Sequence, residues 1–444
     1  MGAFPIRENG EMVRNDDGLV RVGFLGCGNV GSALIRLLAA NADLITRRSG
    51  VRIEVTRVAV QNLTKERDVT FAPGVLTNDG ELVVADRDVD VIVEVIGGVE
   101  PARSLILTAL KAGKPVVTAN KELLANFGEE LFEVAATAGV DLLFEASVAG
   151  GIPLIRPLRE SLVGERIRRV TGIVNGTTNY VLTRMTEERS SLADAVAEAQ
   201  ALGYAEPDPT ADIDGFDAAA KAAIIASIAF GARVVAGDVS REGIRNVTAD
   251  DIGAAAELGY VVKLLAVTEE HDGAVSARVH PAMVPLSHPL ASVRGSYNAV
   301  FIEGEAVGQL MLLGRGAGGG PTSSALLGDL IDAAKNLHSG ARGATVGALE
   351  RRPIRPIDET SSQFYVSLDA ADRPGVLATI SGVFGRHEVS IQSMQQKGQG
   401  DDARLIFVTH VAREAAVAAT IREVRDLDAV NKVGSVLRVV GGEE

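Results

Sequence analysis

Short apolar runs alternate with helical patterns between Leu19 and Phe144. The apolar runs are rich in valine and isoleucine and do not alternate with polar residues, which is typical of strands that are buried on both faces of a sheet. Helical segments such as 32–44 and 101–113 separate them. This order predicts βαβ units around a parallel sheet. The predicted strands are residues 20–26, 52–60, 89–97, 114–120 and 140–146.

The pattern changes after about residue 150. A helical segment at 191–203 precedes several strand patterns, which indicates a second domain of the α+β type. The last part of the chain has a compact βαββαβ pattern and follows a linker that contains proline, arginine and serine. We therefore expect an α/β protein of several domains. The expected divisions are a flexible tail at 1–18, a first domain at 19–148, a second at 149–317, a linker at 349–362 and a third domain at 363–444.

The bulk composition narrows the classes of function. The 444-residue chain has a net charge of −14, which argues against nucleic acid as the main partner, because a phosphate-binding surface needs excess positive charge. Cys27 is the only cysteine, so no internal disulfide can form, which suits a cytoplasmic protein. The N-terminus lacks the apolar core of a signal peptide. The longest apolar tract, 218–237, contains Lys221 and Arg233, so we expect a buried helix and no membrane span.

A glycine-rich loop, GCGNVG, joins the first predicted strand to the first helix. Gly26 permits the tight turn, Gly28 lets the backbone approach a pyrophosphate, and Gly31 lets the helix pack on the strand. The helix N-terminus, with Asn29 and Val30, would face the anion. An ordinary strand–helix turn is the alternative, but the strand–loop–helix–strand context favours dinucleotide binding.

The second strand bears on the type of dinucleotide. In NAD-binding folds, an acidic residue ends this strand and binds the ribose 2′-hydroxyl. Here Gln61 and Asn62 stand near that place, and no carboxylate comes before Glu66. The pattern favours NADP, with Lys65 or Arg57 near the 2′-phosphate, and leaves NAD open.

The stretch DIDGFDAAAKAAIIA, residues 212–226, contains one lysine in an apolar helix, Lys221. A calcium loop is excluded, because its register would place an acidic residue at Thr210 and a glutamate at Lys221. A surface ion pair is disfavoured, because the helix is apolar nearly all round. Asp217 lies four residues earlier and hence on the same face. Spacing alone leaves a catalytic proton donor and a structural buried pair both open.

Further carboxylates stand just before this helix. Glu206 and Asp208 lie on a proline-containing turn, and Asp212 and Asp214 follow. Glu206, Asp212, Asp214 and Asp217 together suggest an acidic pocket, which would suit a substrate ammonium group. A solvated acidic turn remains the alternative for Asp208 and Asp214.

The chain resembles homoserine dehydrogenase over almost its whole length. The resemblance rests on GCGNVG, VVTANKELLA (116–125), FEASVAGGIP (144–153), GIVNGTTNY (172–180) and GYAEPDPTADIDGFDAAAK (203–221). It implies the reversible, NAD(P)H-dependent reduction of L-aspartate 4-semialdehyde to L-homoserine, in threonine and methionine biosynthesis. It also implies a Rossmann-type nucleotide-binding domain, to which residues 318–345 return, and a catalytic and dimerisation domain at 149–317.

The resemblance also implies roles for individual residues. Lys221 would protonate the carbonyl oxygen, and Asp217 and Glu206 would hold the substrate amino and hydroxyl groups. Lys121 would be a second lysine beside the reacting centre and the cofactor. Thr177, Tyr204 and Asp212 are expected on the substrate side, and Gly203, Glu206 and Gly318 against the cofactor. A monovalent cation, commonly sodium, is expected at Glu145, Val148, Gly150 and Ile152, mostly through backbone carbonyls.

The C-terminal segment resembles an ACT domain and carries the turn DRPG, residues 372–375. Gly375 would let an amino acid approach the helix N-terminus, whose amides suit a carboxylate. The resemblance implies feedback by threonine and a homodimer or homotetramer. No kinase-like region is visible in the sequence, so a fused aspartokinase form is not expected.

Two rival functions compete with this one. Aspartate-semialdehyde dehydrogenase needs a cysteine nucleophile, and the sole cysteine, Cys27, lies in the cofactor loop. A non-catalytic regulator that senses a nucleotide and an amino acid is the alternative of another class, and it predicts that Lys221 is dispensable.

Overall fold

The computed structural model describes residues 18–398 and 403–441, and it divides into two compact units. The first unit contains the chain up to residue 164 together with 227–235 and 315–350. The second contains 165–226, 236–314 and the chain from 351 onward. The predicted tail at 1–18 lies almost wholly outside the described residues.

The first unit is built on a six-stranded parallel sheet in the order β3-β2-β1-β4-β5-β6. The prediction of a parallel βαβ sheet is confirmed, and the two-residue strand β3 is an addition to it. Strand β6 is shorter than expected, because a 3₁₀ turn begins at Glu145. The strands are β1 (Leu19–Leu25), β2 (Arg52–Ala59), β3 (Leu76–Thr77), β4 (Val91–Glu94), β5 (Val116–Thr118) and β6 (Leu142–Leu143).

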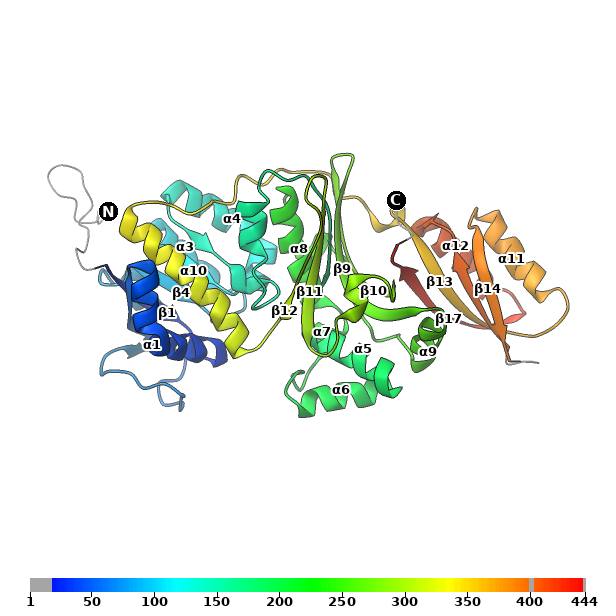
Figure 1. Ribbon diagram of the computed structural model, residues 1–444, viewed down its shortest axis with the longest axis horizontal. Coiled ribbons are helices and arrows are strands. Elements are labelled where there is room, and N and C mark those ends of the chain that lie inside the picture. Colours follow the sequence, from blue (N-terminus) through cyan, green and yellow to red (C-terminus); the bar gives the residue numbers. More distant parts are fainter. Residues whose placement is uncertain (1–17, 399–402, 442–444) are drawn as a thin grey trace. The chain divides into compact units, whose positions relative to one another are not determined.

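Helices cover this sheet, with α1 packed on α10 and α3 on α4 (Figure 1). Helix α1 buries Leu34, Leu38 and Ile45 along one side, and Gly50 ends it in the left-handed conformation. The apolar residues of α1 and α10 share one core with the strands. The helices are α1 (Asn29–Ser49), α2 (Gly80–Ala85), α3 (Ala102–Lys111), α4 (Lys121–Ala138) and α10 (Gly319–Ser339).

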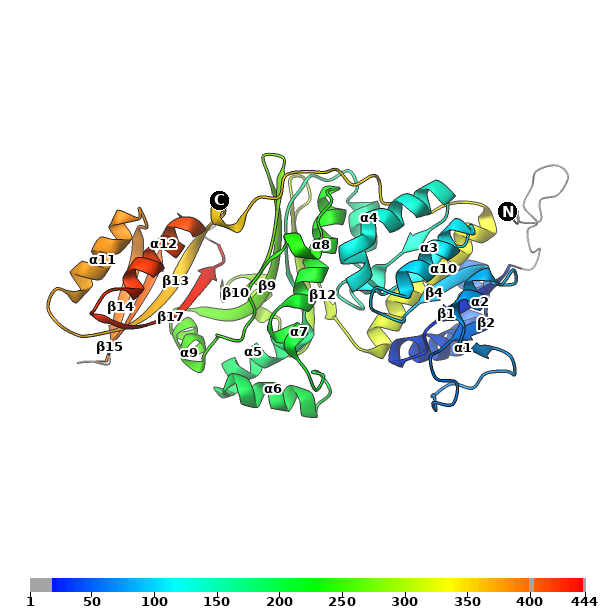
Figure 2. The same ribbon diagram turned by 180° about the vertical axis from the view of Figure 1, so that it is seen from behind.

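The second unit contains an eleven-stranded mixed sheet, in which β12-β11-β7-β9-β10 form one part. Helices α5 and α7 contact each other beside it (Figure 2). Helix α8, whose residues up to 226 belong to this unit, is buried nearly all round, as its sequence predicted. The elements are β7 (Ile167–Ile173), α5 (Gly176–Glu188), α6 (Leu192–Ala201), α7 (Thr210–Ile213), α8 (Phe216–Phe230), β8 (Ser240–Arg241), α9 (Ala249–Glu257), β9 (Tyr260–His271), β10 (Ala274–Pro285), β11 (Tyr297–Gly304) and β12 (Gly308–Arg315).

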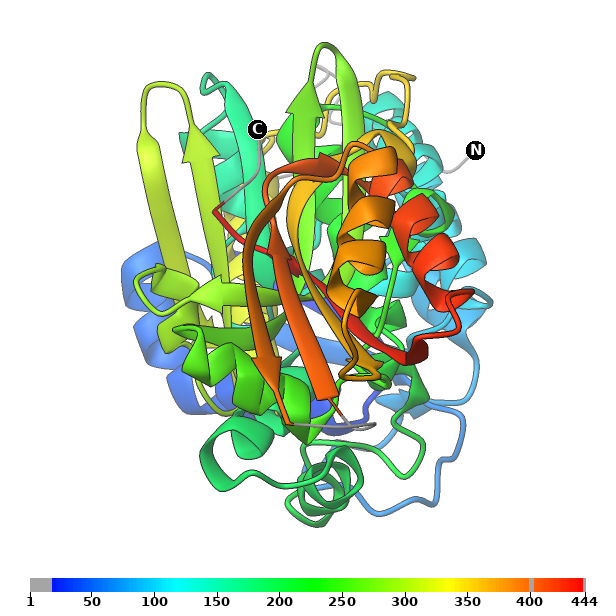
Figure 3. The same ribbon diagram turned by 90° about the vertical axis from the view of Figure 1, so that its right-hand side faces the viewer.

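The C-terminal module has the expected βαββαβ order, and α11 and α12 lie side by side on one face of its sheet (Figure 3). Its core contains Phe384 and Phe407, whose stacked rings lie 5.1 Å apart. The elements are β13 (Ser361–Ala370), α11 (Val376–Arg386), β14 (Ile391–Lys397), β15 (Ala403–Thr409), β16 (Ala412–Arg413), α12 (Glu414–Arg425) and β17 (Val430–Val439).

The segment that was expected to be a linker is hydrogen-bonded to both neighbouring parts of the chain. Within the first unit, Glu350 exchanges backbone hydrogen bonds with Gly231 and Arg233. Within the second, Pro353 and Arg355 bond to Val275 of β10. Among the described residues, no helix is both long and apolar enough to cross a membrane.

Candidate active site

Lys221 and Asp217 form a buried ion pair one turn apart on α8. The Nζ atom of Lys221 donates to Asp217 Oδ2 at 2.7 Å and to the carbonyl of Val174 at 2.7 Å. The two side chains are 10% and 6% exposed, so this is not a surface pair. The spacing argument is thus confirmed in its geometry, and the two acceptors fix the position of the ammonium group.

Asn175 connects the lysine pair to a second carboxylate. Its amide nitrogen donates to Asp217 Oδ2 at 2.8 Å and to Asp212 Oδ1 at 2.6 Å. Its amide oxygen caps α5 by accepting from Thr178 N at 2.8 Å. One buried side chain therefore holds three elements in register: α5, α7 and α8. Asn175 lies within the motif GIVNGTTNY, but the sequence did not predict this role.

Asp212 lies in this cluster with a perturbed acidity. Burial raises the pKa of its carboxyl group, and the negative charge of Asp217 raises it further, against the hydrogen bonds from Asn175 and Thr177. Two carboxylates beside one ammonium leave an excess of negative charge. A bound cation such as an amino group would offset that excess.

The loop before α7 is tied to the same cluster by its backbone. Thr177 Oγ1 donates to the carbonyl of Tyr204 at 2.7 Å, and the Tyr204 ring lies 4.8 Å from that of Tyr180. Gly203 has a φ of +76°, which L residues rarely adopt. Glu206 is exposed, and its carbonyl accepts from the side chain of Gln200 at 3.1 Å.

The remaining two acidic residues have structural roles. Asp214 binds Arg245 through both carboxylate oxygens, at 2.8 and 3.0 Å. Asp208 accepts from Thr210 N at 3.1 Å, and hydrogen bonds from Thr210 lower the pKa of its carboxyl group. Of the four carboxylates that the sequence suggested for an acidic pocket, Asp214 is therefore bound by an arginine instead.

In the first unit, the glycine loop has the geometry that dinucleotide binding requires. A side chain at Gly26 would meet the carbonyl of Val95 at 2.7 Å, and one at Gly31 would meet the carbonyl of Gly26 at 2.9 Å. At Gly28, by contrast, a Cβ atom would have no atom of the described residues within 4 Å beyond its chain neighbours. The open side of the loop is thus at Gly28, where α1 begins without a side-chain cap.

The carboxyl ends of β1 and β4 lie at the same edge of the sheet as the glycine loop. Strands β1 and β4 are adjacent in a sheet whose order reverses there, which is where such folds bind ligands. Glu94 ends β4 fully buried and accepts from Ile96 N and from Thr118 Oγ1 at 2.8 and 2.5 Å. Lys121 begins α4, whose first turn Asn120 caps.

The start of α10 lies against the start of α1. A Cβ atom at Gly319 would lie 3.4 Å from the carbonyl oxygen of Asn29, and Gly318 has a φ of +104°. Gly318 therefore stands beside the cofactor loop within the first unit. The glycines permit this close approach of two backbones.

The two basic residues that were expected near a 2′-phosphate differ in their surroundings. Arg57 lies within β2 and pairs with Asp86 at 2.8 Å. Lys65 is exposed in the loop after β2, and its backbone nitrogen donates to Asn62 Oδ1 at 3.2 Å. Because Arg57 already has a carboxylate partner, Lys65 is the better of the two candidates.

The loop of residues 145–152 has a backbone arrangement that suits a monovalent cation. Ala149 and Gly150 both have positive φ, at 57° and 56°. The Glu145 carboxylate accepts from the amides of Leu154, Ile155 and Arg156 at 2.5–2.8 Å, which leaves the backbone carbonyls as the expected ligands. No described group of three or more His, Cys, Asp or Glu residues could hold a metal ion. A site made of carbonyl oxygens is not such a group.

Asp329 of α10 is hydrogen-bonded to the start of this loop. Its carboxylate accepts from Glu145 N at 2.8 Å and from Arg156 at 2.9 Å. Burial raises the pKa of Asp329 to about 7.

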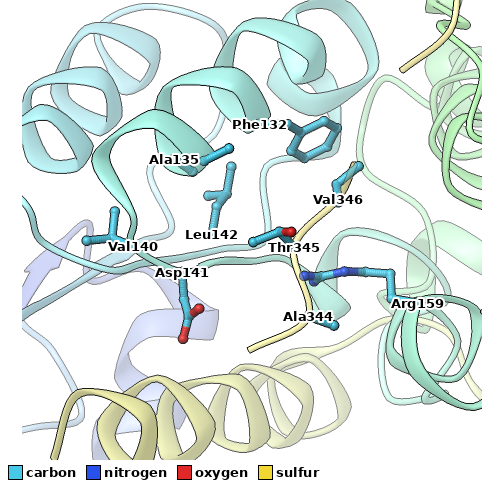
Figure 4. Close-up of a pocket in the computed structure, with 10 residues that line it drawn as sticks. Phe132, Ala135, Val140, Asp141, Leu142, Arg159, Ala344, Thr345 and Val346 are labelled. Atoms are coloured by element: carbon cyan, nitrogen blue, oxygen red, sulfur yellow. The ribbon is translucent and has the colours of Figure 1, made fainter. Parts of the chain in front are cut away.

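A cavity beside Arg159 is too small for a substrate (Figure 4). Its volume is about 10 Å³, which is room for one water molecule. Arg159 Nε is buried there and has no hydrogen-bond acceptor among the described residues, and burial lowers the pKa of the guanidinium group. A single water would satisfy that donor.

The parallel sheet with an open glycine loop, and the buried lysine paired with a carboxylate, are the features expected of an oxidoreductase that uses a nicotinamide dinucleotide. Family models described as "Homoserine dehydrogenase, NAD binding domain", "Homoserine dehydrogenase" and "ACT domain" match residues 26–145, 153–331 and 364–429. The chain is 49% identical to a homoserine dehydrogenase of Mycobacterium tuberculosis, over 96% of this chain and 99% of that one. It belongs to the homoserine dehydrogenase family.

Other relatives agree with this assignment. The homoserine dehydrogenase of Corynebacterium glutamicum is 48% identical over 95% of each chain. A crystal structure of a homoserine dehydrogenase from Thiobacillus denitrificans superposes with a TM-score of 0.90 at 41% identity, and covers 95% of this chain and 98% of its own. The predictions of an enzyme and of a C-terminal ACT domain are confirmed, and the non-catalytic alternative is not supported.

Proposed function

We propose that Lys221 is the general acid in the reduction of L-aspartate 4-semialdehyde to L-homoserine, and the general base in the reverse direction. The observation that carries the proposal is the buried contact of 2.7 Å between Lys221 Nζ and Asp217 Oδ2. In the reductive direction, a reduced nicotinamide held by the glycine loop would supply the hydride to the aldehyde carbon. Lys221 gives a proton to the carbonyl oxygen, which becomes the hydroxyl group, and solvent then returns a proton to the lysine.

The carboxylates have a distinct role in this proposal. Asp217 orients Lys221, and Asp217 and Asp212 offer negative charge to the substrate ammonium group. Glu206 lies on the exposed loop before α7, where it would bind a substrate hydroxyl or amino group or contact the cofactor. Thr177 and Tyr204 hold that loop to the N-terminus of α5 and border the substrate.

The cofactor proposal rests on the first unit. The amides of Asn29, Val30 and Gly31 at the start of α1 would bind the pyrophosphate, and Gly28 would let it approach. We favour NADP over NAD, with Lys65 near the 2′-phosphate. Lys121 and Gly318 would lie on the cofactor side, and Gly203 and Glu206 would contact it from the loop before α7.

A monovalent cation, which we propose to be sodium, would bind the carbonyl oxygens of Glu145, Val148, Gly150 and Ile152. The neighbouring carbonyls of Phe144 and Ala149 are not among these ligands, and each already accepts a backbone hydrogen bond. The positive φ angles at Ala149 and Gly150 support a turn that gathers backbone oxygens. The ion would order the loop and has no acid–base role here. Exchange of sodium for tetramethylammonium should lower the melting temperature if the site is used.

Threonine is the proposed effector of the ACT domain. Gly375, with φ of +90°, begins α11 without a side-chain cap, which would let an amino-acid carboxylate reach the helix N-terminus. Strands β12 and β14 are the two ends of the eleven-stranded sheet, and such edges support the expected homodimer or homotetramer. Sedimentation with and without threonine would test both expectations.

The reaction itself is tested by one assay. Oxidation of NADPH and of NADH by the native chain is followed with aspartate 4-semialdehyde, and the reverse reaction with homoserine. Turnover that prefers NADPH is expected. No turnover with either cofactor in either direction would overturn the proposed reaction.

A further inference from the structure

The last strand of the ACT domain is also a strand of the catalytic domain's sheet. Strand β17 pairs in parallel with β10, with Arg438 opposite Ala282 and Val439 opposite Met283. The amide of Val440 continues the pairing by donating to Met283 O at 2.9 Å. The two domains are therefore joined here by backbone hydrogen bonds as well as by side chains.

Arg438 connects this strand to a segment outside the ACT domain. Its side chain is 13% exposed and pairs with Glu414 at the start of α12. Its Nη1 atom donates to Glu242 Oε2 at 3.0 Å. Glu242 directly follows β8, which pairs with β10, and its amide donates to Val279 O at 2.7 Å. One buried guanidinium thus links α12, β17 and the residue after β8.

The residues next to Glu242 contact the turn between α7 and α8 through the backbone. Ile244 N donates to Ile213 O at 2.8 Å. A Cβ atom at Gly243 would lie 2.1 Å from Ile213 O and 2.5 Å from the Cα atom of Asp214. Glycine is therefore needed for this approach of two backbones.

Two arginines that flank Glu242 hold the same turn. Arg241 donates to the carbonyl of Asp214 at 2.6 Å and lies over the Phe216 ring at 3.4 Å. Arg245 binds the Asp214 carboxylate through two hydrogen bonds. Asp214 lies in the turn between α7, which carries Asp212, and α8, which carries Asp217. The segment 241–245 therefore holds the turn that joins the two helices bearing the carboxylates of the candidate site.

We propose that Glu242 is a positioning residue for substrate binding, and that Arg438 of the ACT domain sets the position of Glu242. The proposal rests on the proposed function in one respect, namely that Asp212 and Asp217 bind the substrate ammonium group. Contacts run from β17 through Arg438 and Glu242 to the α7–α8 turn. A shift of β17 therefore changes the separation of the two carboxylates and with it the affinity for substrate.

A second pair at the same domain boundary provides a matched control. Arg404 of β15 binds Asp250 of α9 at 2.8 Å, and Asp250 is 65% exposed. This pair joins the ACT and catalytic domains as the Arg438–Glu242 pair does, but its catalytic-domain partner lies on α9, outside the segment 241–245. Loss of Arg404 should therefore loosen the boundary without moving the α7–α8 turn.

The test compares full-length Glu242→Gln, Glu242→Asp, Arg438→Gln and Arg404→Gln with the native chain in homoserine oxidation. The native chain is measured first. An inactive native chain would count against the proposed reaction and not against the positioning role of Glu242 and Arg438. We expect Glu242→Gln and Arg438→Gln to raise KM for homoserine about 3- to 10-fold, which lies within the range found for mutations that modulate such couplings. KM for the cofactor and kcat should change by less than about twofold.

Three further results decide the proposal. Glu242→Asp should raise KM for homoserine less than Glu242→Gln does, because aspartate keeps the negative charge. The double variant Glu242→Gln with Arg438→Gln should match either single variant, because both remove one link. An unchanged homoserine KM in Glu242→Gln, or an equal rise in Arg404→Gln, would overturn the proposal. Glu242 is 44% exposed, so Glu242→Gln should fold. The test therefore remains valid even if Arg438→Gln does not fold.

Discussion

Asn175 donates its amide to Asp217 at 2.8 Å across 42 positions of sequence, and the same nitrogen reaches Asp212. These two hydrogen bonds hold both carboxylates of the candidate site on one amide group. They also fix the carboxylate that orients Lys221. The acid–base pair on α8 is therefore positioned by the residue that caps another helix.

Replacement of Asn175 separates its two roles. Asn175→Ser keeps an oxygen that can cap α5 but is too short to reach both carboxylates, whereas Asn175→Ala loses both functions. We expect kcat/KM for homoserine to fall about 10- to 100-fold in both variants, since a hydrogen bond to a charged group is worth ~1.5–3 kcal/mol. The free energy of unfolding should fall by ~1 kcal/mol more in the alanine variant. Equal kcat/KM in the serine variant and the native chain would contradict the role of Asn175.

Two glycines of the cofactor loop should respond differently to alanine. At Gly28 a methyl group would point into open space, so Gly28→Ala should leave the melting temperature unchanged and weaken NADPH binding. A clash that costs ~1–3 kcal/mol corresponds to roughly 5- to 150-fold in Kd. At Gly31 the methyl group would meet the Gly26 carbonyl, so Gly31→Ala should lower the melting temperature. Fluorescence titration and thermal unfolding measure the two effects, and native NADPH affinity in Gly28→Ala would contradict the placement of the pyrophosphate.

Lys263 should make stability depend on pH in the alkaline range. It is buried in β9, where it donates to Asn179 Oδ1 at 3.0 Å, and burial lowers the pKa of its ammonium group to about 8. As pH falls, the unfolded chain takes up this proton near pH 10.5, before the folded chain does. The free energy of unfolding should therefore fall as pH decreases from about 10.5 to about 8 and should not change further below that.

The matched variant for this prediction is Lys263→Met. The difference in unfolding free energy between native and variant chains, from urea titrations at several pH values, should shift by roughly 1–3 kcal/mol across that range, in favour of the native chain at high pH. A difference that does not depend on pH would show that Lys263 keeps its ordinary pKa in the folded chain.

The parts of the fold that could be predicted from the sequence depend on local patterns. The buried strands of the first unit and the glycine loop are encoded by neighbouring residues, and the Lys221–Asp217 pair by one helical turn. The role of Asn175 was not predicted, because its cap is local but its two carboxylate partners lie 37 and 42 positions away. The pairing of β17 with β10 has no local signature either. The loop of residues 145–152, for which we propose cation binding, lacks a side-chain pattern, because its proposed ligands are carbonyl oxygens.

Removal of the ACT domain would not be a specific test of regulation by threonine. A chain that ends near Arg352 would lose β17 and expose the edge of β10 with which it pairs. Threonine inhibition could then change in such a chain for two reasons, the loss of an effector site or damage to the catalytic sheet, and the measurement would not separate them. Titration of the full-length chain with threonine, in the native form and in Arg438→Gln, avoids that difficulty.

The central claim is that Lys221 delivers the proton. Its most direct test is the single-turnover rate of NADPH oxidation with saturating aspartate 4-semialdehyde in Lys221→Ala, with NADPH affinity and melting temperature measured on the same sample. We predict a rate about 10²- to 10⁴-fold below that of the native chain, as expected for loss of a general acid, with NADPH binding retained. A rate within about twofold of the native value would contradict the assignment of Lys221 as the proton donor.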